Sequence, residues 1–231
     1  MGKMSRLHTG AFLSVALLSV PIAAEGAVLA TYGFDAITAN SGESMAIGEA
    51  QLFVDVIEIE IGVTDQVQFH FYNLGSAESS ITDVYFDDGT LLGIASISGG
   101  SGVSFAQEAS PPVLPGGKSI DFEVTAGFLA DSDPPVQPNG VNPGEYLDIT
   151  FDLLPGKTLA DVVDALDGGR DLRIGIHVQG FANEGSESFI NLKDPDSPEE
   201  GDTLHHTPEP ASLAVWGLGL AAVALCRRRR P

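Results

Sequence analysis

The sequence has almost no cysteine and, over most of its length, almost no positive charge. One cysteine in 231 residues excludes a fold held together by a framework of disulfide bonds. Between positions 25 and 207 there are five lysine and arginine residues against 31 aspartate and glutamate residues, a formal charge of −26. Because binding to nucleic acid requires clustered positive side chains, this composition excludes a general nucleic-acid-binding protein.

The remaining basic residues lie near the two ends, beside apolar runs. Lys3 and Arg6 precede the apolar stretch 11–20, and small residues follow Pro21. This order is typical of a secretory signal peptide, so residues 1–27 are predicted to direct export. The run is too short to span a bilayer core of about 30 Å, and the alternative is a buried N-terminal helix.

A second apolar run, residues 211–226, carries no charged side chain and is followed by a basic cluster. The cluster consists of Arg227, Arg228, Arg229 and Arg230. As a helix the run would reach about 24 Å, slightly less than a full membrane span. Basic residues stay on the cytoplasmic side of a membrane, which predicts that the acidic body lies outside. Cys226 is interpreted as an apolar residue of this helix, with a lipidation or redox site as the alternative.

Pro208, Glu209 and Pro210 stand directly before the second apolar run. The two prolines favour an extended segment, in which a protease can reach the peptide bonds. With the apolar run and the arginine cluster, this tail resembles the PEP-CTERM sorting signal. The resemblance implies transient anchoring in the inner membrane and processing by an exosortase, which passes its substrate to the cell surface or to an extracellular matrix of exopolysaccharide and biofilm. The alternative is an ordinary single-span anchor.

The body between the two ends shows apolar residues at every second position. This period indicates strands with one buried face and one face in solvent. The clearest stretches are 56–64, 66–71, 120–125, 147–153 and 172–179, and weaker candidates are 28–34, 81–87, 91–98, 103–107 and 187–193. The prediction is therefore an all-β domain over residues 28–193, an antiparallel β-sandwich or jelly-roll-like fold. A parallel α/β sheet is disfavoured because its strands lack such alternation.

Three connecting segments complete this organisation. One short helix is predicted after Thr158, which caps it together with Asp161, and Gly168 ends it. The proline-rich segment 130–145 is predicted to be either a functional loop or an ordered crossover between the two sheets of the sandwich. Residues 194–207 are predicted to form an acidic stalk before the sorting signal at 208–231. Segments 80–89, 131–135 and 174–181 also resemble uncharacterised PEP-CTERM surface proteins, a resemblance that implies no activity.

The body carries no sequence signature of an enzyme, and no catalytic residue is predicted. It has no Gly-x-Ser-x-Gly elbow, phosphate-binding loop or dinucleotide fingerprint. His70 and His177 lie on polar strand faces, where they would bind a metal if they shared a face or would otherwise be solvated. The carboxylate pairs in the loops would suit a structural calcium ion, because calcium prefers oxygen ligands. The candidate ligands are Asp87, Asp88, Asp131 and Asp133. The alternative for these residues is a solvated acidic surface.

Two functions remain after these exclusions. The first is a structural protein of the cell surface or extracellular matrix, delivered by the sorting signal. The second is a carbohydrate-binding module for exopolysaccharide, in which Tyr72 and Tyr85 would stack against sugar rings. Exposed aromatic candidates are few, and the single tryptophan, Trp216, lies in the C-terminal apolar run. This scarcity favours the structural role.

Overall fold

The computed structural model describes residues 26–61, 64–88, 91–108, 111–168 and 171–193. The predicted signal peptide up to residue 25, the stalk and the sorting signal lie outside this part of the chain. In chain order the elements are β1 (Val28–Ala36), α1 (Gly42–Gln51), β2 (Leu52–Ile61), β3 (Thr64–Asn73), β4 (Ser80–Asp88), β5 (Leu91–Gly99), β6 (Phe105–Gln107), the 3₁₀ helix η1 (Gly117–Ile120), β7 (Leu129–Ser132), α2 (Val136–Asn139), β8 (Tyr146–Leu153), α3 (Leu159–Gly168), β9 (Leu172–Gln179) and β10 (Glu187–Lys193).

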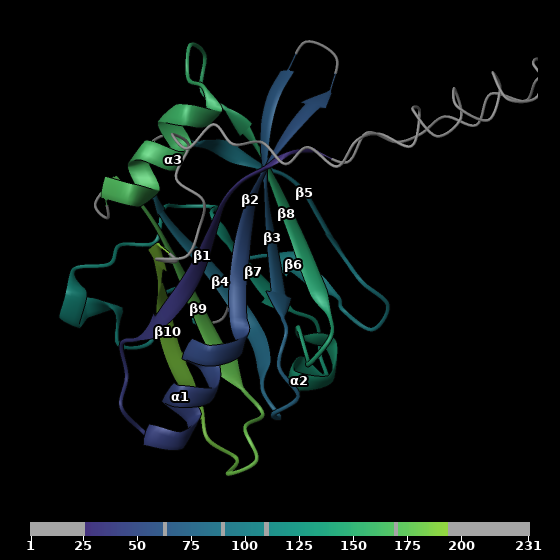
Figure 1. The fold of residues 1–231 in the computed structure, drawn as a ribbon, viewed down its shortest axis with the longest axis vertical. Coiled ribbons are helices and arrows are strands. Elements are labelled where there is room, and N and C mark those ends of the chain that lie inside the picture. The colour runs from purple at the N-terminus through teal and green to yellow at the C-terminus, as the bar shows by residue number, and fades with distance from the viewer. Residues whose placement is uncertain (1–25, 62–63, 89–90, 109–110, 169–170, 194–231) are drawn as a thin grey trace, which may run out of the picture.

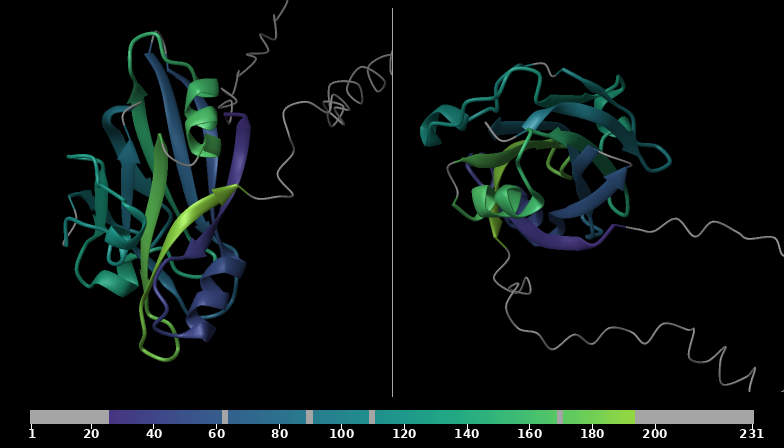
Figure 2. Two further views of the ribbon diagram at one scale, coloured as in Figure 1. Left: turned by 90° about the vertical axis from the view of Figure 1, so that its left-hand side faces the viewer. Right: turned by 90° about the horizontal axis from the view of Figure 1, so that it is seen from above.

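The ten strands form one sheet in the order β5-β8-β3-β2-β1-β10-β9-β4-β7-β6. Neighbouring strands within it are antiparallel. The sheet curls until its end strands β5 and β6 meet, so that it is nearly closed (Figures 1 and 2). The predicted all-β antiparallel class is confirmed, and the alternating apolar residues face the inside of the curled sheet.

Aromatic rings fill the interior and join opposite walls of the sheet. Phe69 of β3 and Phe151 of β8 both contact Phe86 of β4, with ring centroids 5.1 and 4.7 Å apart. All three side chains are fully buried. Burial of each ring contributes roughly 1.5–3 kcal/mol, so the packing of β3 and β8 against β4 is a main source of stability.

The helix predicted after Thr158 is present as α3, and its predicted cap is formed. The Thr158 N–H donates to Asp161 Oδ2 (2.7 Å), and the Asp161 N–H donates to Thr158 Oγ1 (3.3 Å). This reciprocal pair is a capping box. Val162 and Leu166 are buried against the core, so the helix lies across one end of the curled sheet (Figure 1).

A second helix, α1, was not predicted, because its buried face is made of small and polar residues. Ser41 caps it, and Ser44, Gly48 and Gln51 are the buried positions. A Cβ at Gly48 would lie 2.2 Å from the Phe189 ring, so a glycine is needed for the helix to approach β10. Such a face gives no apolar stripe, which is the signal that identifies an amphipathic helix in a sequence.

The predicted strand at 120–125 is wrong. Asp121 adopts a left-handed conformation, with φ at 51°, and the Phe122 N–H donates to the carbonyl of Gly117 in a local turn. The segment follows η1 and covers the outside of the sheet. There Phe122 packs with Leu114, Leu129 and Tyr85 in a small second core. The alternation in 120–125 therefore does reflect buried side chains, but they belong to a loop that covers the sheet. The strand that pairs with β4 in this region is β7.

Of the two alternatives for segment 130–145, the structure shows an ordered crossover, but it joins two parts of one sheet and not two separate sheets. It continues from β7 through α2 to β8, on another part of the sheet. Backbone hydrogen bonds in both directions between Val141 and Ile81 fix it to β4, with lengths of 2.9 and 3.2 Å. No helix in the described part of the chain has the length and apolar character that a membrane crossing requires.

Candidate functional site

Two rows of polar and aromatic side chains cross the outer face of β2, β3 and β8. The strand register places Phe53, Tyr72 and Tyr146 in one row. The same register places Asp55, His70 and Asp148 in the next row. Directly opposed side chains on one face of an antiparallel sheet lie close enough to interact, so six residues from three strands meet here.

Four rings of these rows form a continuous band, which we call the aromatic row: Phe53, Tyr72, His70 and Tyr146. Successive ring centroids lie 5.7, 5.4 and 5.1 Å apart, and the interplanar angles are 24°, 35° and 34°. The first pair is stacked and the other two pairs are tilted, so the four rings contact one another in series on the outer face of the sheet. Tyr146, at one end, is 42% exposed and offers the most accessible ring.

Two carboxylates hold the aromatic row in position. Asp55 accepts hydrogen bonds from the Tyr72 hydroxyl (3.2 Å) and the Thr31 hydroxyl (2.6 Å). The Nδ1 atom of His70 lies 2.6 Å from Asp148 Oδ1. An ionised carboxylate only accepts hydrogen bonds, so Nδ1 carries the proton in this pair. The ring orientations are thus fixed by side chains from neighbouring strands.

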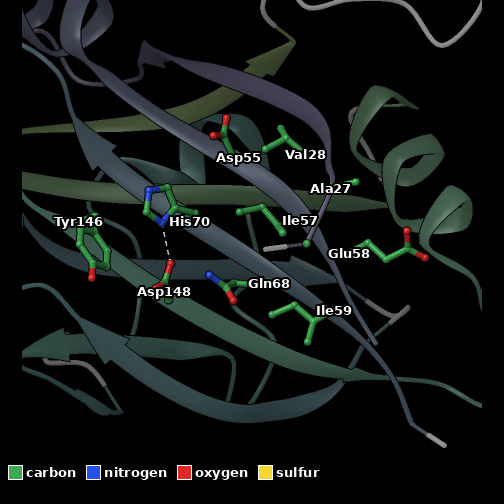
Figure 3. A pocket seen from close by; sticks show the side chains of 11 residues that line it. Ala27, Val28, Asp55, Ile57, Glu58, Ile59, Gln68, His70, Tyr146 and Asp148 are labelled. Carbon is green, nitrogen blue, oxygen red and sulfur yellow. Dashed lines mark hydrogen bonds and ion pairs between the residues drawn. The ribbon is translucent and has the colours of Figure 1, made fainter. Parts of the chain in front are cut away.

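The surface is hollowed along these rows. A hollow of about 820 Å³ and a smaller one of about 350 Å³ share Asp55, His70 and Tyr146, and we call the two together the groove. Figure 3 shows the larger hollow, with Tyr146, His70 and Asp148 gathered at one end and Glu58 at the other. Aliphatic side chains line the opposite end: Ala27, Val28, Ile57 and Ile59. The larger hollow is therefore polar and aromatic at one end, and mainly aliphatic with one carboxylate at the other.

The groove is also strongly acidic. Asp55, Glu58 and Asp148 line the larger hollow, and Glu145 lines the smaller one. Among the described residues that line them there is no lysine or arginine. The overall negative charge of the body is thus repeated locally along the groove.

The C-terminal region is assigned by comparison with a known sequence family, independently of the groove. The family model of the PEP-CTERM protein-sorting motif matches residues 206–230. The chain carries a PEP-CTERM sorting signal. The matched range contains Pro208, Glu209, Pro210 and the arginine cluster, which confirms the resemblance of the tail. No curated protein matches the chain.

The sorting signal determines how the protein is handled. It marks an exported protein that an exosortase processes. Its precursor is anchored in the membrane and is then sorted to the cell surface. The sorting signal therefore predicts that the folded body is delivered to the outside of the cell.

The structure separates the two tyrosines predicted to stack on sugars. Tyr72 lies in the aromatic row, at the smaller hollow of the groove. Tyr85 is fully buried under the 111–125 segment, where its hydroxyl donates to the carbonyl of Pro111 (3.0 Å). Burial raises the pKa of Tyr85, and the nearby Asp83 and Asp131 carboxylates raise it further. The prediction for Tyr85 is corrected: its ring supports the second core and offers no face to a ligand.

The predicted calcium ligands do not converge on one point. Asp131 pairs with Asp83 of β4, so Asp87 lies about 13 Å further along that strand. Asp87 is bound by Arg173, and Asp133 accepts a hydrogen bond from the Ser104 hydroxyl (2.6 Å). The side chain of Asp88 lies outside the described part. Among the residues that the structure describes, no group of three histidine, cysteine or acidic side chains could hold a metal ion.

His70 and His177 do not form a common metal site either. They lie on β3 and β9, which are separated in the sheet by β2, β1 and β10. That spacing is about 19 Å along the sheet. Each instead pairs with its own carboxylate, His70 with Asp148 and His177 with Asp83.

Sequence reasoning did not select Asp55 and Asp148 for the site. Both lie at polar positions of strands in which apolar and polar residues alternate, and many of the 32 acidic residues in the chain do the same. Only the pairing of β2 with β3 and of β3 with β8 places them on either side of His70. The available signal was the composition of one strand, β3, where His70 and Tyr72 share the polar face.

Proposed function

We propose that the exported body is a carbohydrate-binding module that attaches the surface protein to extracellular polysaccharide through the groove. The observation that carries this proposal is the aromatic row, whose four contacting rings lie on the outer face of the sheet and end in the exposed ring of Tyr146. Sugars present apolar ring faces that stack on aromatic side chains, and hydroxyl groups that donate to carboxylates. Asp55 and Asp148 place such acceptors directly beside the rings.

The shape of the groove supports a polymer as the ligand. The two hollows adjoin through three common residues and cross three strands, so they form an open channel along the surface. A small metabolite is bound more commonly in a closed cleft that buries most of its surface. A chain of sugars can instead lie across successive rings, each of which contributes a modest stacking interaction.

The proposed role is binding without turnover. The sequence favoured a structural role over carbohydrate binding. The proposal reverses this preference, because strand pairing brings together an aromatic surface that is not visible in the sequence. A surface or matrix protein with a purely structural role is the outcome if no carbohydrate binds.

Removal of single rings tests this proposal. Tyr72→Ala and Tyr146→Ala should each weaken binding to polysaccharides retained by the unmodified protein, by roughly five- to tenfold for one stacking contact. The matched control is Val113→Ala, which also truncates an exposed apolar side chain but lies in the segment that covers the opposite wall.

Binding is measured with the purified full chain on a panel of soluble glycans, and the glycans are analysed for cleavage afterwards. Equal affinity of both tyrosine variants and the unmodified protein would exclude the groove as the site. Shortened glycans would replace the binding role with a hydrolytic one.

A further inference from the structure

We propose that the groove selects polysaccharides whose sugars carry free, protonated amines, in preference to neutral or uronic acid polymers. This inference rests on the carbohydrate-binding role proposed above and specifies the chemical class of its ligand. It follows from three properties of the groove: the position of its carboxylates, the orientation of its rings and the sign of its charge.

The carboxylates are placed where an amine on a stacked sugar would lie. Asp55 and Asp148 flank His70 in one cross-strand row, next to the row that contains Tyr72 and Tyr146. The hydrogen bonds described for both carboxylates use the Oδ1 atom. A carboxylate has about four acceptor positions on its two oxygens, so both retain capacity for an ammonium group.

The rings add a second attraction for the same group. A cation above an aromatic face is attracted by the negative centre of the ring, and this attraction grows where water is partly excluded. Tyr146, the exposed ring at the end of the aromatic row, lies beside His70 and lines the larger hollow together with Asp148. A neutral sugar would gain the stacking interaction and hydrogen bonds from its hydroxyl groups, whereas an ammonium group adds its charge to both contacts, so the ring and the carboxylate together favour an aminated sugar.

The wider charge distribution acts in the same direction. The larger hollow contains three carboxylates and no lysine or arginine among its described lining residues. The stretch from residue 25 to 207 carries 31 acidic against five basic side chains. Such a field raises the local concentration of polycations and repels polyanions, more strongly at low salt. A uronic acid polymer would meet repulsion both on approach and in the groove.

Two oligosaccharides of equal length and linkage test the proposal: a glucosamine hexamer and its fully N-acetylated counterpart. At a pH that keeps the amines protonated, the purified full chain should bind the glucosamine hexamer roughly tenfold more tightly. Added salt should weaken the binding of the glucosamine hexamer and leave that of the acetylated hexamer nearly unchanged. This comparison uses the unmodified protein, so it does not depend on the folding of a variant.

A pair of double variants separates the groove from the overall charge. Asp55→Asn with Asp148→Asn should abolish the preference for the glucosamine hexamer. The matched control is Asp121→Asn with Glu123→Gln, which removes two exposed charges from the opposite wall and should retain the preference within about twofold. Asn also tolerates the left-handed conformation at position 121.

The outcomes distinguish this inference from the broader proposal. Equal affinity for the two hexamers, with loss of both on Tyr146→Ala, overturns the amine preference and retains carbohydrate binding. An equal loss of preference in both double variants shows that overall charge, and not the groove, selects the ligand. Absence of binding to either hexamer and to every other glycan overturns both proposals.

Discussion

Arg173 should be one of the residues on which the stability of the fold most depends. It projects from β9 beneath the 111–125 segment, with its side chain 15% exposed. Its guanidinium binds Asp87 through Nε and Nη2, and Nη1 donates to the carbonyl of Ile120 (2.8 Å). Its central carbon lies 5.2 Å from the centroid of the Phe122 ring. One side chain therefore ties the covering segment, β4 and β9 together.

The Arg173→Ala substitution would leave Asp87 without its cation while that carboxylate is only 20% exposed. Breaking a fully buried ion pair costs about 3–5 kcal/mol, and solvent reduces this value here, so we expect a loss of about 3 kcal/mol. In a domain of this size that corresponds to a fall in Tm of about 6–12 °C. Arg173→Lys keeps the charge but loses the forked geometry, and should cost about 1–2 kcal/mol.

The assay is chemical unfolding followed by circular dichroism, with Lys118→Ala as the control. Lys118 is exposed on η1, so its removal changes the net charge equally while leaving the Arg173 contacts in place. Its loss should change the free energy of unfolding by no more than about 0.5 kcal/mol. Equal stability of Arg173→Ala and Lys118→Ala would refute the reasoning, because the network around Arg173 would then contribute nothing beyond its charge.

Two further predictions concern the helix cap and the sorting signal. The hydrogen bonds from the Thr158 N–H and hydroxyl lower the pKa of Asp161 below its ordinary value of 3.8. The stability that they contribute is therefore fully present above pH 3.8, and it is lost as the pH falls through the lower pKa of the folded state. Asp161→Asn should therefore reduce the urea midpoint at pH 7, by an amount that shrinks below pH 3.8; a constant difference down to pH 2 would contradict this. Replacement of Pro208, Glu209 and Pro210 by alanine should retain the precursor in the membrane fraction, whereas Pro198→Ala should not. Undiminished delivery of the triple variant to the cell surface would show that the motif is not used.

The local pattern of the chain predicted most of the strands and one of its helices. Strands β2, β3, β8 and β9 follow stretches of clear alternation, and α3 begins at its predicted cap. The helix cap depends on residues close together in the sequence. The alternation in a strand depends on a single boundary between core and solvent. They failed where the buried surface was of another kind: Phe122 belongs to a loop that packs on the outside of the sheet, and α1 presents Gly48 rather than an apolar stripe to the core.

The sequence by itself determined the sorting signal and the acidic charge, because both depend on composition and on residues adjacent in the chain. The tertiary structure alone decided the groove, since strand order and register bring Asp55, His70 and Asp148 together from three strands. It also decided that Tyr72 lines the groove while Tyr85 is buried. Both tyrosines lie on the outer face of strands in which apolar and polar residues alternate. Tyr85 is buried only because the 111–125 segment packs over the outside of β4.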